Sequence, residues 1–123
     1  GSGFYKYEGK QQTPNESLEQ WRRSTARNED VDLAQRLIFL MVNEAARCLE
    51  EKVVGSPEDA DYGMILGTGF APFRGGPLRF ADHFGLKKIV DEMERLAQSD
   101  EKFTPCELLK KHAHDRTTFY ENR

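Results

Sequence analysis

The sequence predicts an all-α fold, a single domain of five or six helices. Apolar residues recur every three or four positions over long stretches, the spacing that gives a helix one buried face. Two sequences, Ser56-Pro57-Glu58-Asp59 and Thr104-Pro105-Cys106-Glu107, combine a capping residue with a proline at the first helical position and a following acid, which is typical of helix starts. The length of 123 residues suits one hydrophobic core.

The first fifteen residues are expected to be a linker with an aromatic segment. Phe4–Glu8 alternates and is rich in aromatic residues, so it could form a short extended segment, and Lys10–Asn15 is predicted to be a polar loop. Gly1–Gly3 could be a cloning remnant or native sequence. Because the chain begins without methionine, we expect it to be a fragment of something longer.

The helical domain is expected over residues 16–115, followed by a tail over 116–123 without periodicity. Its first helix, Glu16–Ala26, is modest and places Leu18 and Trp21 on one face.

The main helix is expected to run from about Val31 to Val53. Asn28–Asp30 offers a cap for its start, and Gly55 is expected to end it. Its centre, LIFLMV at 37–42, is apolar on all sides and should therefore run through the core.

A third helix is predicted to start at Ser56-Pro57 and to reach about Leu66. After a glycine-rich loop, a fourth helix should begin near Gly76-Pro77 and stop at Gly85. An amphipathic helix follows, and the last helix should run from the Thr104-Pro105 signal to about His114. The amphipathic helix has its apolar residues at i, i+3, i+4 and i+7: Leu86, Ile89, Val90, Met93, Leu96 and Ala97.

The stretch Ile65–Asp82, reading ILGTGFAPFRGGPLRFAD, is the most informative part of the chain. Glycine allows backbone geometry that other residues cannot reach, and proline fixes φ and removes a donor. Their concentration among aromatic residues predicts a defined loop that makes close contacts and joins two helices. The residues concerned are Gly67, Gly69, Gly75, Gly76, Pro72 and Pro77, with Phe70, Phe73 and Phe80 between them.

The composition argues against several classes of protein. The net charge is about −3 with both signs mixed along the chain, so no basic stripe predicts nucleic-acid binding. The longest apolar run, Leu37–Val42, is far shorter than the ~20 residues that cross a bilayer, and no signal peptide is visible. Cys48 and Cys106 lie inside predicted helices and are interpreted as small buried hydrophobic residues in a reducing compartment.

Three blocks together resemble the C-terminal helical domain of 3-hydroxyacyl-CoA dehydrogenases. They are RLIFLMVNEAARCLEE at 36–51, SPEDADYGMILGTGF at 56–70 and PFRGGPLRFADHFG at 72–85. The opening GSGFYKYEG is similar to the G-x-G-F-Y-x-Y linker before this domain in the family. Multifunctional members carry two tandem copies of the helical unit, and GTGFAPFRGGPLRFAD looks like the second copy.

The resemblance implies an enzyme family that oxidises 3-hydroxyacyl-CoA with NAD in fatty-acid β-oxidation, with enoyl-CoA hydratase on the same chain in multifunctional members. This chain lacks the strand–G-x-G-x-x-G–helix signature of a dinucleotide site, because Phe70-Ala71-Pro72 follows Gly67-Thr68-Gly69. The family's catalytic His–Glu pair also lies in the nucleotide-binding domain. We therefore expect no cofactor in this chain, with NAD bound by the absent domain of the parent.

One further catalytic residue of the family is an asparagine within an N-R-L sequence of the first copy. Here the matching residues are Gln35-Arg36-Leu37, and the longer amide of Gln35 would misplace the group. The departure supports the second-copy assignment, and we assign no catalytic residue.

Arg74, Gly75 and Gly76 are a candidate anion site or interdomain contact. A helix begins there, its free N–H groups would point outward, and an arginine lies beside them, so a CoA phosphate would be the natural ligand. The alternative is that the glycines permit a tight turn and that Arg74 pairs with an acid such as Asp82.

Other candidates have structural interpretations. His112 and His114 look metal-like, but residues at i and i+2 point about 200° apart on a helix, so we predict no metal site. Asp82 and His83 suggest acid–base chemistry, but neighbours on a helix do not face each other. Asn43-Glu44 is expected to be a polar contact within the core or toward a missing domain.

The aromatic residues near the two ends could form an acyl-binding groove or could attach the ends to the body of the domain. The second interpretation is favoured. The residues are Phe4, Tyr5, Tyr7, Trp21, Phe119 and Tyr120.

The leading hypothesis is a non-catalytic C-terminal domain of a multifunctional 3-hydroxyacyl-CoA dehydrogenase, inactive in isolation, that supports interdomain and dimer packing. Its expected partners are the upstream domains of the parent, or a second copy when isolated. The alternative is a stand-alone helical dimerisation or interaction module, and a complete small enzyme is the third. The C-terminus is not a Ser-Lys-Leu address, which favours a cytoplasmic parent, with mitochondria as the alternative.

Overall fold

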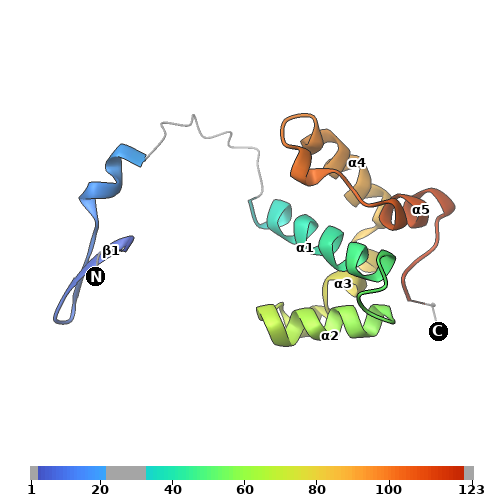
Figure 1. Ribbon diagram of the computed structural model, residues 1–123, viewed down its shortest axis with the longest axis horizontal. Coiled ribbons are helices and arrows are strands. Elements are labelled where there is room, and N and C mark those ends of the chain that lie inside the picture. Colours follow the sequence, from blue (N-terminus) through green and yellow to red (C-terminus); the bar gives the residue numbers. More distant parts are fainter. Residues whose placement is uncertain (1–2, 22–32, 121–123) are drawn as a thin grey trace. The chain divides into compact units, whose positions relative to one another are not determined.

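The computed structural model describes residues 3–21 and 33–120. The chain divides into two compact units, Gly1–Val31 and Asp32–Arg123 (Figure 1). The second unit contains all five α-helices of the described residues, which confirms the predicted helical class. The first unit contains a β-hairpin that the sequence analysis did not predict.

The hairpin pairs β1 (Tyr5–Glu8) with β2 (Gln11–Pro14) in antiparallel register. The extended segment predicted at 4–8 is therefore confirmed, but its predicted loop partner is a strand. The strands are joined at Gly9, whose φ of +62° favours glycine. Both strands are exposed along their whole length.

The helix predicted over Glu16–Ala26 is instead a short 3₁₀-helix, η1 (Glu16–Trp21), within the described residues. Asn15 organises its start, since its Oδ1 accepts hydrogen bonds from both the N–H and the hydroxyl of Ser17. The rest of the predicted helix, the cap at Asn28–Asp30 and the side chain of Trp21 lie outside the described residues.

Helix α1 (Leu33–Glu50) is the central helix of the second unit, but two predictions about it were wrong. Leu37 is 63% exposed, so the LIFLMV segment does not have a core contact on every side. The helix also ends before Gly55: Lys52 takes the left-handed conformation with φ +59°, and the N–H of Val53 bonds back to Cys48 O. The buried residues of α1 are Phe39, Val42, Asn43, Ala45 and Ala46.

Helix α2 (Pro57–Thr68) starts as predicted, because Ser56 Oγ accepts a hydrogen bond from the N–H of Asp59. The turn η2 (Pro72–Arg74) leads to α3 (Pro77–Phe84), and Gly85 separates α3 from α4 (Leu86–Ala97). The periodic apolar residues of α4 are buried, except that Ala97 is half-buried, which confirms its amphipathic prediction.

The last helix, α5 (Glu107–Asp115), does not use Thr104 as its cap. A 3₁₀-turn, η3 (Glu101–Phe103), occupies the preceding residues, and Cys106 stands at the N-cap without a side-chain bond. Asn43 of α1 provides the acceptor instead: its Oδ1 takes the N–H of Cys106 at 2.8 Å, and its Nδ2 donates to Thr104 O at 3.0 Å.

The core lies between α1 and the other four helices. Helix α1 contacts α2, α3 and α5, and in Figure 1 it lies between α2 and the α4–α5 pair. Cys48 and Cys106 are both free thiols, with Cys106 buried and Cys48 half-buried. Among the described helices, none has the length and apolar composition needed to cross a bilayer.

Candidate functional site

The glycine-rich segment does not form a phosphate-binding turn at its start. Gly69 takes the left-handed conformation, with φ +72°, and ends α2. Its N–H bonds to Ile65 O, and the N–H of Phe70 bonds to Met64 O. Because these groups close the end of a helix instead of opening a new one, the turn does not fit a dinucleotide phosphate.

The start of α3 is closed from within the chain by Asp61. This carboxylate is 2% exposed and accepts hydrogen bonds from the N–H groups of Leu78 (2.7 Å) and Arg79 (3.0 Å). The first N–H groups of a helix have no intrahelical partner and attract anions. Here α2 supplies that anion. The N–H groups that the anion interpretation required are therefore already bonded.

Gly76 permits this close approach. Its φ is +104°, and an added Cβ would overlap the Cβ and Cγ atoms of Asp61. Both the backbone conformation and the lack of a side chain are therefore required at this position. The predicted close contact within the glycine-rich loop is confirmed here.

Arg74 does not pair with Asp82, so that part of the sequence interpretation was wrong. Its guanidinium lies over the rings of Phe73 (5.7 Å) and Phe80 (5.3 Å), and within the described residues no carboxylate lies within ion-pair distance of it. The side chain is exposed. The proposed interdomain role of Arg74, Gly75 and Gly76 stays a prediction.

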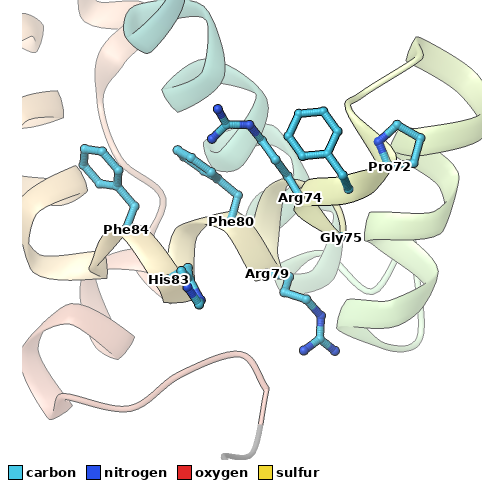
Figure 2. Close-up of a pocket in the computed structure, with 8 residues that line it drawn as sticks. Pro72, Arg74, Gly75, Arg79, Phe80, His83 and Phe84 are labelled. Carbon is cyan, nitrogen blue, oxygen red and sulfur yellow. The ribbon is translucent and has the colours of Figure 1, made fainter.

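A hollow of about 540 Å³ lies beside η2 and α3, and we call it the α3 groove. Figure 2 shows Arg74, Phe80 and Phe84 pointing to one side of α3, and Arg79 and His83 to the other. The groove combines aromatic rings and cations, with no carboxylate among its lining residues. These are Pro72, Phe73, Arg74, Gly75, Arg79, Phe80, His83 and Phe84.

Asp82 holds the C-terminal segment against α3. Its two oxygens accept the N–H groups of Phe119 and Tyr120, each at 3.0 Å. Burial raises the pKa of Asp82, while these two hydrogen bonds act in the opposite direction. The structural interpretation that the sequence favoured for Asp82 therefore agrees with its hydrogen bonds.

Tyr120 connects the segment to Asp61. Its hydroxyl donates to Asp61 Oδ2 at 2.7 Å, and Arg79 lies 3.8 Å above its ring. Burial, followed by the bond to Asp61, raises the pKa of the phenol. The prediction that terminal aromatic residues attach an end to the body is confirmed for Phe119 and Tyr120, which pack against the core. Phe4 and Tyr7 are instead 83% and 67% exposed.

The two histidines of α5 have separate partners. His112 Nδ1 lies 2.8 Å from Thr117 Oγ1 and its ring contacts Phe119, while His114 Nδ1 lies 2.9 Å from Asp115. Burial lowers the pKa of His112, and nearby Asp82 partly offsets this. In the described part of the chain, no group of three or more His, Cys, Asp or Glu residues is placed to hold a metal ion.

Comparison with known proteins identifies the second unit. Residues 33–118 match the 3-hydroxyacyl-CoA dehydrogenase C-terminal domain. The chain belongs to this family.

Curated relatives extend the match to nearly the whole chain. The fatty acid oxidation complex subunit alpha of Vibrio vulnificus (strain CMCP6) is 41% identical over 99% of this chain. Those of Vibrio parahaemolyticus and Shewanella loihica are each 41% identical over 98% of it. The chain spans 18% of the length of these relatives.

Sequence reasoning found the segment but missed its organising residue. The role of Asp61 was not predicted, because Asp61 lies within α2, 17 residues before the Leu78 N–H group to which it bonds. The structure shows that Asp61 and Ala60 are the buried residues of α2, whereas Glu58 and Asp59 belong to its first turn. A buried acid at such a position requires donors from elsewhere in the fold.

Proposed function

We propose that this chain is the second copy of the helical unit in a multifunctional NAD-dependent 3-hydroxyacyl-CoA dehydrogenase of fatty-acid β-oxidation. Its role is to support the packing of the parent enzyme, and the parent's nucleotide-binding domain holds NAD. The proposal draws on the identity with fatty acid oxidation complex alpha subunits over nearly the whole chain. It also draws on GTGFAPFRGGPLRFAD, which resembles the second copy, and on Gln35 in place of the first copy's asparagine.

The observation that carries the supporting role is the use of the buried polar side chains. Asn15, Asn43 and Asp61 are the buried polar residues within the described part of the chain. Each is bonded to backbone groups, two of them at the start of a helix in the second unit. A general acid or base needs an atom that reaches a substrate. These side chains use their atoms to hold the fold.

Arg36, which follows Gln35 in the sequence, also has a structural contact. Arg36 lies with its guanidinium 4.9 Å from the ring centre of Phe103, so it packs α1 against η3. Cation–π contacts of this kind stabilise a fold by roughly 0.5–1 kcal/mol when partly exposed.

The second unit also exposes large apolar side chains that an upstream domain would cover. Leu33 and Leu37 on α1 are 68% and 63% exposed, and Phe73 is 87% exposed. Leu33 and Leu37 are one helical turn apart, and exposed apolar residues that share a face are typical of interaction surfaces. The same observation supports the alternative of a stand-alone interaction module. The two proposals differ in the partner: the upstream part of one parent chain, or an unrelated protein.

The test compares the full parent enzyme with a version that lacks residues 32–123. We expect the shortened enzyme to unfold at a lower temperature and to lose dehydrogenase turnover with 3-hydroxyacyl-CoA and NAD, with partial recovery when this chain is added in trans. A parent carrying Lys102→Glu, a surface charge change, is the control. Unchanged stability and turnover of the shortened enzyme would refute the supporting role. NADH formation by the isolated chain would refute its non-catalytic nature.

The proposal places the parent in the cytoplasm. The two cysteines are free thiols, as expected in a reducing compartment. Burial also raises the pKa of Cys106, which keeps this thiol protonated and unreactive.

A further inference from the structure

We propose that the segment after α5, residues 116–120, detaches from α3 as one unit while the five helices stay folded. We call this segment the latch. When attached, it is bonded along one side of α3, and its detachment gives access to that side without unfolding the domain. The inference concerns contacts within the second unit and does not depend on the proposed function.

The latch is held to α3 by side chains and not by a backbone ladder. Within the described chain, its backbone bonds to a helix are those from its first two N–H groups to His112 O, which close the end of α5. The N–H groups of Phe119 and Tyr120 bond instead to the two carboxylate oxygens of Asp82. Segments with few backbone bonds to the rest of a fold open at a lower free energy than its core helices.

No residue of the latch is fully buried. Arg116 and Thr117 are exposed, and the three residues that follow are half-buried. The rings of Phe119 and Tyr120 pack against the core from its edge. Detachment therefore exposes two half-buried rings, while the buried side chains of the five helices keep their contacts with one another.

Arg116 is the hinge of the latch. It takes the left-handed conformation, with φ +56°, which is unfavourable for a residue that has a side chain. Its N–H bonds to His112 O and ends α5. The hydrogen bonds to α3 begin at Phe119, so a rotation at this position moves the whole latch away from α3 and leaves α5 in place.

The groups of the body that hold the latch remain satisfied when it detaches. Asp61 loses the hydroxyl of Tyr120 but keeps the N–H groups of Leu78 and Arg79. Asp82 is half-buried, so water can hydrate its carboxylate in the detached state. Arg79, whose guanidinium lies 3.8 Å from the centre of the Tyr120 ring, is exposed. The helices therefore tolerate detachment, because a buried polar group without a partner is what makes opening costly.

The contacts of the latch depend on one another, so we expect it to detach as a whole. Phe119 and Tyr120 share one carboxylate, that of Asp82, as their acceptor. Thr118 Oγ1 donates a hydrogen bond to Tyr120 O within the latch. The ring of Phe119 also contacts that of His112, with 4.5 Å between their centres. A contact made by one residue thus holds its neighbours in place.

The experiment is amide hydrogen exchange of the whole chain, followed by NMR at Phe119 and Tyr120. We expect equal protection of the two amides, weaker than that of the α1 core and stronger than that of an exposed loop. Asp82→Asn offers one acceptor oxygen in place of two and should speed the exchange of both amides by about tenfold or more. Tyr120→Phe removes the bond to Asp61 and should speed both by about fivefold, although it leaves their own bonds to Asp82 in place.

Two controls separate detachment of the latch from unfolding of the domain. Phe103→Leu removes volume from a buried side chain of η3, which contacts α1 and α4. It should speed the exchange of the α1 core amides by roughly tenfold and leave that of Phe119 and Tyr120 unchanged. Asp91→Asn changes an exposed acid on α4 and should alter neither. Circular dichroism should show the same helical content for every variant.

Three results would overturn the proposal. Latch amides that exchange as slowly as the α1 core, and that Phe103→Leu speeds to the same extent, would show that the latch opens only when the domain unfolds. Exchange as fast as that of an exposed loop would show that the latch is not attached. A Tyr120→Phe variant that speeds the exchange of one latch amide and not the other would show that the two do not open as one unit.

Discussion

On one side of α3, the closed side, the polar groups of Asp61, Asp82 and Tyr120 bond to one another or to backbone. On the other side, the open side, Phe73 and Arg74 face solvent. Both sides are built by the same glycine-rich segment. The closed side uses Gly76 to bring two helices together, and the open side uses Gly75 to end a turn that presents an aromatic ring. One short segment thus closes a buried contact on one side and leaves an aromatic ring and a guanidinium in solvent on the other.

The comparison predicts that changes on the closed side unfold the domain and that changes on the open side do not. Asp61→Ala should have the largest effect. It removes the acceptor of two backbone N–H groups and of the Tyr120 hydroxyl, and we expect the free energy of unfolding to fall by about 3–5 kcal/mol. Urea denaturation measures this. Asp91→Ala, which breaks an exposed pair with Lys87, should cost under about 0.5 kcal/mol.

Gly76→Ala tests whether the close approach itself matters. The added methyl group would overlap Asp61, and the backbone would keep a φ of +104°, so we expect a loss of about 2–4 kcal/mol. Gly63→Ala is the matched control, because it adds the same methyl group to open space on α2. It should raise the unfolding temperature, since alanine favours the helix by about 1 kcal/mol. A Gly76→Ala protein as stable as the original would show that the Asp61 contact is dispensable.

Asn43→Ala should have a smaller but clear effect at the other buried polar contact. The variant leaves the N–H of Cys106 and the carbonyl of Thr104 without a partner, which we expect to cost about 2 kcal/mol. Thermal unfolding followed by circular dichroism would measure it. The neighbouring Glu44→Ala, on the exposed face of α1, should change stability by under about 0.5 kcal/mol.

The smallest effect should come from pH. Burial lowers the pKa of His112 in the folded chain below 6.5, so the unfolded chain binds the proton more readily. Stability from this residue is therefore present above about pH 6.5 and is lost as the pH falls through the lowered pKa. Because the ring is partly exposed, we expect this loss to be small. Melting curves between pH 7.5 and 5.5 should show the difference in unfolding temperature between the original chain and His112→Gln becoming smaller as the pH falls.

On the open side, Phe73→Ser should leave the free energy of unfolding within about 0.5 kcal/mol, because the ring is 87% exposed. Urea denaturation measures this free energy. A large loss of stability would show that Phe73 belongs to the core after all.

Much of the helical fold was predictable because it is encoded locally. Ser56-Pro57 began α2, and the glycine at 85 separated two helices, as expected from capping and backbone preferences. The periodicity of Leu86–Ala97 likewise predicted its buried face. These signals act within a few residues, so a single sequence shows them.

The errors arose where distant residues replace the local signal. Thr104 looked like the cap of the last helix, but Asn43, which is 63 residues before Cys106 in the chain, supplies the acceptor. Gly55 looked like the end of α1, but Lys52 takes the left-handed position. The strand β2 (Gln11–Pro14) was missed because Thr13 is its one β-branched residue and it has no aromatic residue, whereas strands are usually enriched in both.

The candidate site was located by the sequence but not explained by it. Arg74 and the two glycines were found from their composition. The partner of the helix start was not, because Asp61 approaches α3 through tertiary packing. Arg74 does not pair with Asp82 as the sequence interpretation had it, because its guanidinium lies over the rings of Phe73 and Phe80.

The most direct test of the closed side is amide hydrogen exchange at Leu78 and Arg79, measured by NMR on the original chain. The first N–H groups of a helix lack an intrahelical partner and ordinarily exchange quickly. Because Asp61 accepts both from a buried position, we predict that they exchange as slowly as the amides of the α1 core. Exchange as fast as that of an exposed loop would contradict the account, since the start of α3 would then be open to solvent.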